Sequence, residues 1–138
     1  MTKTYKLFLV LSLMASFLAF FIGSVAMAAT QLDYAGFHNG EAIKTGNQLL
    51  DREGLGQRDV WIMYAMTAIK HAKAALVHAE REYKKTGKAR VKKYISELTD
   101  GIGYLQAAID YAMKGRNILT TAQTMANAKK GMKFVQKC

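Results

Sequence analysis

The chain has 138 residues, a net charge of +10 and a hydrophobic fraction of 51%, which suits one domain with one modest core. Its single cysteine excludes a fold held by an internal disulfide, and its lack of proline removes the commonest helix breaker. The basic balance indicates an anionic partner, although such a charge also serves simply to keep a small domain soluble.

The first 28 residues have the organisation of a secretory signal. Two lysines precede a largely apolar, uncharged run from residue 7 to 25, which ends in the small-x-small sequence Ala-Met-Ala at 26–28. These are the parts of a cleavable signal peptide. The sequence therefore predicts a signal peptide over 1–28, a mature domain over 29–138 and a periplasmic location. The alternative is an inner-membrane anchor formed by residues 7–28, because about 20 apolar residues can span a bilayer.

Glycines and capping residues divide the mature chain into segments. Residues 31–40 have a mixed composition and are expected to form a loop. A short helix is expected over 41–52, where two glycines follow. Asp59 is a residue type that caps helices, and it predicts a helix from 59 to 86.

Two long segments carry apolar residues at alternating steps of three and four. They are Ile62, Ala65, Ile69, Ala72, Leu76, Ala79 and Tyr83 in the first, and Val91, Ile95, Leu98, Ile102, Leu105, Ile109 and Ala112 in the second. This heptad-like pattern is typical of the packed face of a helix, and it predicts helices over 59–86 and 89–114. The second helix is expected to continue through Gly101 and Gly103. A last helix is expected near 117–136, with a less regular pattern.

The connections between these predicted helices are short. Short links between helices with apolar stripes favour antiparallel neighbours, and no segment shows the alternation of a β-strand. The sequence therefore predicts an all-α protein, an antiparallel up-and-down four-helix bundle.

Histidine or tyrosine follows several apolar positions by two residues. His71 follows Ile69, and His78 follows Leu76. At 100° per residue such a position lies about 200° from the apolar stripe, so both imidazoles are expected to point away from the core on one exposed ridge. The same outward position is held elsewhere by Thr45, Tyr64, Tyr104 and Tyr111. Packing gives no reason for exposed imidazoles, which makes these two histidines candidate metal ligands.

The string IKHAKAALVHAE at residues 69–80 resembles a repeat unit of the small metal-binding protein (SmbP) family, and the likeness is recognisable again over 101–115. The resemblance implies an exported helical bundle that binds divalent metals such as copper and nickel, and buffers or carries them. Members of that family have histidine at most outward positions. In this chain Thr45, Tyr104 and Tyr111 stand where the repeat suggests histidine, so the resemblance supports the fold and the location better than it supports metal binding.

Helix geometry limits which residues could share an ion. His71 and His78 are separated by about 10.5 Å along a helix, a gap that two bonds of about 2.0 Å cannot close. Glu82 lies four residues after His78, the spacing of a helical chelate. His78 and Glu82 are therefore the predicted pair for copper, nickel or zinc, and His71 is expected to bind separately or through groups on an adjacent helix. The alternative is that both histidines are solvated surface residues.

The sulfur-containing residues are further candidates. The methionines after residue 28 are Met63, Met66, Met113, Met125 and Met132. Thioethers suit Cu(I), but the position of Met66 beside the apolar stripe favours a role in filling the core. Cys138 could bind a metal, join two chains in a homodimer or remain a free thiol at the end of the chain.

No catalytic motif is present in the sequence. It lacks HExxH, a Gly-rich phosphate loop, a haem-attachment motif and the Glu-x-x-His pairs of di-iron bundles. We therefore expect no enzyme. Two functions remain: an exported metal-binding bundle, or a non-catalytic basic interaction or structural module of the envelope that has lost metal binding. The second would take an acidic envelope protein or an anionic membrane surface as its partner, and nucleic acid is not expected for an exported chain.

Overall fold

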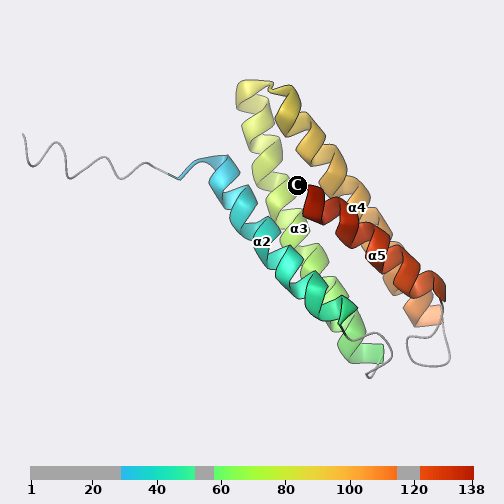
Figure 1. The fold of residues 1–138 in the computed structure, drawn as a ribbon. Coiled ribbons are helices and arrows are strands. Elements are labelled where there is room, and N and C mark those ends of the chain that lie inside the picture. Colours follow the sequence, from blue (N-terminus) through green and yellow to red (C-terminus); the bar gives the residue numbers. More distant parts are fainter. Residues whose placement is uncertain (1–28, 52–57, 115–121) are drawn as a thin grey trace, which may run out of the picture.

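The computed structural model describes residues 29–51, 58–114 and 122–138, which form four helices (Figure 1). The helices are α2 (Gln31–Leu50), α3 (Arg58–Thr86), α4 (Ala89–Lys114) and α5 (Ala122–Lys137). No strand occurs in these three ranges. The helices pack along one another around shared apolar residues, so the prediction of an all-α helical bundle is confirmed.

Several predicted features lie outside the described residues. They are the segment 1–28, both as a signal peptide and as an anchor, and the start of the last helix before residue 122. Within the part of the chain that the structure describes, no helix is both long enough and apolar enough to cross a membrane.

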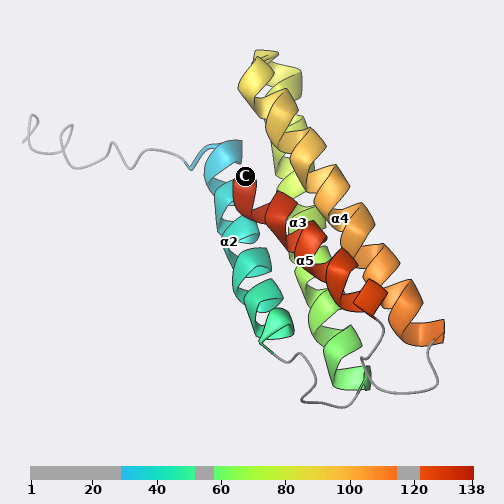
Figure 2. The ribbon, with the colours of Figure 1, turned by 45° about the vertical axis from the view of Figure 1, so that its right-hand side comes forward.

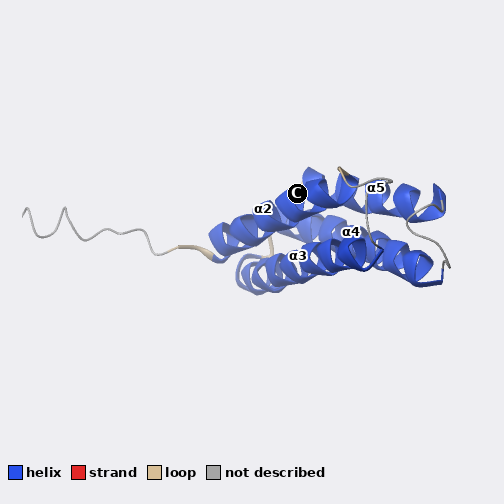
Figure 3. Ribbon diagram, turned by 90° about the horizontal axis from the view of Figure 1, so that it is seen from below, coloured by secondary structure: helices blue, strands red, loops and turns tan. Residues whose placement is uncertain are grey.

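The helices form two layers. Viewed from below, α2 and α5 lie in one layer and α3 and α4 in the other (Figure 3). Helix α2 packs most extensively on α3, and α5 packs on α4, whereas α2 and α5 touch over a smaller area (Figure 2). At the smallest of these interfaces, Asn39 donates a hydrogen bond to the Val135 carbonyl oxygen at 3.2 Å. The Met132 side chain also occupies the place where a Cβ on Gly46 would lie.

Helix α2 begins well before the predicted position, because residues 31–40 are helical and not a loop. The Thr30 hydroxyl accepts a hydrogen bond from the Asp33 amide at 3.2 Å, and the Asp33 carboxylate accepts one from the Thr30 amide at 2.7 Å. This capping box satisfies amides that the first turn otherwise leaves unpaired. It outweighs Gly36 and Gly40, each of which costs a helix about 1 kcal/mol relative to alanine.

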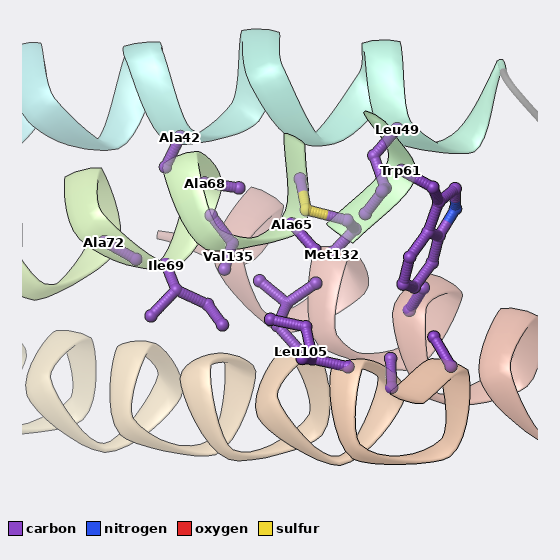
Figure 4. Close-up of a cluster of buried hydrophobic side chains, with 14 of the residues drawn as sticks. Ala42, Leu49, Trp61, Ala65, Ala68, Ile69, Ala72, Leu105, Met132 and Val135 are labelled. Atoms are coloured by element: carbon purple, nitrogen blue, oxygen red, sulfur yellow. The ribbon is translucent and has the colours of Figure 1, made fainter. Parts of the chain in front are cut away.

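Small side chains form the buried face of α3. The buried residues repeat at steps of four and three, and they are Trp61, Ala65, Ala68, Ala72, Ala75 and Ala79, with Ile69 beside them (Figure 4). Of the predicted stripe, Ile62 and Leu76 are only half-buried. The packed face is therefore turned toward Ala68 and Ala75, because α3 packs on both α2 and α4 and not on one partner alone.

Larger apolar residues fill the centre of the bundle. Leu49, Leu105, Met132 and Val135 bring α2, α4 and α5 into one cluster with Ile69 and the alanines of α3 (Figure 4). As predicted, α4 continues through both of its internal glycines. Because Ile69 and Ile109 belong to this same cluster, the apolar stripes of the two long helices share one core.

Candidate functional site

The three histidines of the chain lie together between α2 and α3, and we call His38, His71 and His78 the histidine cluster. The centre of the His38 ring is 6.0 Å from that of His71 and 5.6 Å from that of His78. The rings are inclined by only 30° and 11°, so His38 stacks with both neighbours. All three side chains are half-buried. The sequence pattern predicts the two histidines of α3 as candidates but does not single out His38.

The prediction of an exposed ridge is wrong. His71 and His78 are half-buried because the packed face of α3 is turned, so that positions beside it lie in the groove against α2. Thr45 is buried and donates a hydrogen bond to the Glu41 carbonyl oxygen at 2.8 Å. Tyr104 stacks on a phenylalanine of α5, and Tyr64 packs against the core. Of these outward positions, only Tyr111 is exposed.

A hydrogen bond orients the His78 ring. Its Nδ1 lies 2.8 Å from Oε1 of Gln31 in the first turn of α2, and Tyr34 stacks on the ring at 5.3 Å. An amide oxygen only accepts hydrogen bonds, so Nδ1 carries the proton and Nε2 keeps its lone pair. Metal-binding histidines are commonly oriented by a second ring nitrogen that donates in this way. The Nε2 atom of His78 is therefore prepared to act as a ligand.

His38 has an unsatisfied ring nitrogen. Its Nδ1 is buried and has no hydrogen-bond partner, while Phe37 packs edge-on against the ring at 5.4 Å. Leaving such a group unpaired costs about 1–3 kcal/mol, and in proteins a buried polar group of this kind commonly marks a bound ion or water. His38 thus has a free nitrogen in the middle of the histidine cluster.

The cluster brings imidazoles within range of a shared ion without closing a complete site. Two rings bound to one ion through bonds of about 2.0 Å have centres no more than about 6 Å apart, and both contacts of His38 lie within that limit. In the described ranges, however, no three His, Cys, Asp or Glu side chains form a group that could hold a metal ion. His38 can therefore be shared with one neighbour at a time, after rotation of the stacked rings.

The predicted pair of His78 and Glu82 is not joined by any hydrogen bond or ring contact in the part of the chain that the structure describes. Glu82 is half-buried, and its carbonyl oxygen accepts a hydrogen bond from the Thr86 hydroxyl at 3.0 Å. Its carboxylate lies one helical turn from His78, which is the geometry on which the prediction rests. The pair stays a prediction.

The methionines divide into two groups. Met125 and Met132 are buried, as predicted, but Met63, Met66 and Met113 are 55%, 59% and 64% exposed. The prediction of core filling is wrong for these three because the buried faces of α3 and α4 are turned away from them. Met66 and Met113 instead line a groove between the two helices.

Cys138 is half-buried against α4. Its Sγ lies 3.5 Å from the Phe134 carbonyl oxygen, 3.8 Å from that of Tyr94 and 4.0 Å from the Glu97 carboxylate. Burial, with the Glu97 charge, raises the pKa of the thiol to about 12. A neutral thiol is a poor metal ligand and a poor nucleophile, which favours the free-thiol alternative. A homodimer through Cys138 stays a prediction.

Comparison with known proteins identifies no relative: no family model, no curated protein and no solved structure matches this chain. The likeness to the small metal-binding protein family therefore depends on the strings at residues 69–80 and 101–115 alone.

Proposed function

We propose that this is a small, non-enzymatic helical-bundle protein of the bacterial cell envelope that binds divalent copper, nickel or zinc for buffering or transport. The observation that supports this most is the meeting of all three histidines of the chain at one interface between two helices. The periplasmic location is proposed from the signal-like first 28 residues.

In this proposal His38 is the shared ligand, and it binds an ion together with either His78 or His71. Imidazole suits zinc, copper and nickel. The Gln31 contact leaves Nε2 of His78 available, and Glu82 can add a carboxylate one turn away. Two or three protein ligands leave room for water in the coordination shell, so binding is expected to be modest and exchange easy. Such behaviour suits a buffer or a carrier better than a structural metal site.

The test is calorimetric titration of copper(II) into four proteins: wild type, His38→Ala, a His71→Ala/His78→Ala double variant and Lys73→Ala as a surface control on α3. We expect binding to wild type and to the lysine variant, a loss of roughly tenfold or more in affinity for His38→Ala, and no specific binding to the double variant. Circular dichroism checks that each variant is folded. No uptake by wild type at micromolar protein, or equal binding by the double variant, contradicts the proposal.

The alternative function is a basic interaction or structural module without metal, with an acidic envelope protein or an anionic membrane as its partner. The net charge of +10 and the small number of histidines favour it. It becomes the better account if wild-type protein takes up no metal.

A further inference from the structure

The turn between α3 and α4 carries a dense group of cations, which we call the basic tip: Lys84, Lys85, Lys88, Arg90, Lys92 and Lys93. All six side chains are exposed, and no acidic residue lies between the first and the last of them. Within the described chain, only Lys93 among the six forms an ion pair, with Glu97 at 4.0 Å. The tip is therefore a concentrated and largely uncompensated positive surface.

Helix stability does not account for this charge. Lys84 and Lys85 suit the last turn of α3, where the helix dipole is negative. Arg90 and Lys92, in contrast, lie at the start of α4, where the dipole is positive and the first turn holds no acidic residue. Helices α2 and α3 each begin with an aspartate. Cations at the start of α4 oppose the dipole, which indicates a role other than stability.

The basic tip lies at the end of the bundle where α2 begins (Figures 1 and 2). Leu32 and Ala35 of α2 share an apolar cluster with Tyr83 and Val91, which flank the turn. The chain before residue 29 therefore joins the bundle on the side of the tip. That preceding chain includes the apolar run at 7–25, so the tip would face the bilayer if this run enters a membrane.

The composition of the tip favours a lipid surface over a protein. Protein interfaces generally have an apolar or aromatic centre that is desolvated on binding. The exposed large apolar residues of the described chain are Tyr34, Phe37, Met63, Met66, Val77, Tyr111 and Met113, and none lies within the tip. Several lysines and arginines close together bind anionic headgroups without any such centre.

We propose that the basic tip binds the surface of an anionic phospholipid bilayer and so holds the bundle end-on against the membrane. The proposal does not depend on metal binding, since the histidine cluster uses other residues. Each basic residue near such a surface strengthens binding about fivefold, so the loss of four is expected to weaken it by at least a hundredfold.

The test uses the full chain and vesicles of two compositions: phosphatidylcholine alone, and phosphatidylcholine with phosphatidylglycerol in equal parts. Cosedimentation is measured for wild type, for a tip variant with Lys85, Lys88, Arg90 and Lys92 changed to glutamine, and for a body variant with Lys44, Lys70, Lys73 and Lys133 changed to glutamine. The two variants lose the same charge. An apolar N-terminal segment would insert into both compositions, so the difference between them reports the charge of the helical domain.

We expect wild type and the body variant to prefer the anionic vesicles, the preference to weaken with salt, and the tip variant to lose it while binding copper as wild type does. Helical circular dichroism shows that both variants are folded, and the tip variant should be at least as stable as wild type because it relieves the start of α4. Equal losses in the two variants would assign binding to diffuse charge and overturn the proposal. The absence of any preference in wild type, with or without capture of an acidic protein, would overturn it as well.

Discussion

Gly101 of α4 and Gly131 of α5 face one another with their backbones in close approach. A Cβ added to Gly131 would lie 2.9 Å from the Gly101 carbonyl oxygen, and one added to Gly101 would lie 3.1 Å from the Gly131 oxygen. Both glycines are buried. The small side of each helix thus lets the other approach, and this offsets the conformational cost of glycine within a helix.

Replacing Gly131 by alanine should therefore separate α4 from α5. The new methyl group would press on backbone atoms, which cannot move aside as a side chain does, and we expect a loss of about 1–3 kcal/mol in the free energy of unfolding. Gly103→Ala is the matched control, since no atom lies within 4 Å of a Cβ there. It should stabilise the protein by about 0.5–1 kcal/mol through helix propensity. Urea unfolding measures both, and the same sign for the two variants would contradict this account of the interface.

Glu82 and His38 test which residues share the ion with His78. If the interface supplies the second ligand, His38→Ala should weaken copper binding much more than Glu82→Gln does. If the helical pair supplies it, the order should be reversed. Glu82→Gln keeps the size of the side chain and removes only its charge, so calorimetry compares ligand chemistry at nearly constant packing. Glu80→Gln, on an exposed residue of the same helix, is the control for lost charge.

Alkaline pH should destabilise the fold through Cys138 and Tyr94. Burial raises the pKa of Cys138 from 9.0 to about 12 and that of Tyr94 from 10.0 to about 12. Both groups ionise more readily in the unfolded chain, so stability is complete below about pH 9 and falls as pH rises toward 12. Urea midpoints across this range measure the decline. Cys138→Ala should reduce the slope and leave the part due to Tyr94, whereas an unchanged slope would show that the thiol does not contribute.

The N-terminus of the protein in the cell envelope should be Ala29. The sequence Ala26-Met27-Ala28 matches the small-x-small site at which a signal peptide is removed. Intact-mass measurement of the protein isolated from the envelope fraction determines where the chain begins. Retention of residues 1–28 would indicate an anchored protein instead.

The two long helices could be predicted closely because their signals agree. An apolar stripe, terminal glycines and charged last turns all indicate the boundaries of α3 and α4. The start of α2 could not be found from composition, since Gly36 and Gly40 obscure the capping box at Thr30 and Asp33. The buried face of α3 was displaced for a different reason. Alanine suits both buried and exposed helical positions, so the pattern of isoleucine and leucine carries more weight in a sequence than in this core.

The candidate site could be predicted only in part. His71 and His78 stand out because they repeat at a seven-residue interval on one helix. His38 lies in the segment expected to be a loop, and its approach to α3 is a contact between distant parts of the chain that no local spacing encodes. One signal was available: the Thr30 and Asp33 pair extends the helix, which would have placed Tyr34 and His38 on successive turns of one face.

The alanines of α3 have a consequence for the ligands they do not touch. Ala35 and Ala42 of α2 are buried in the same clusters as Ala68, Ala72, Ala75 and Ala79, and such small groups allow the two helices to lie close together. The distance between imidazoles on facing helices is therefore set by methyl groups in the interior. Enlarging one of them to valine would spread the histidines apart while leaving every ligand in place. Affinity could drift between related chains, or be tuned by a designer, through positions that a comparison of metal ligands would never inspect.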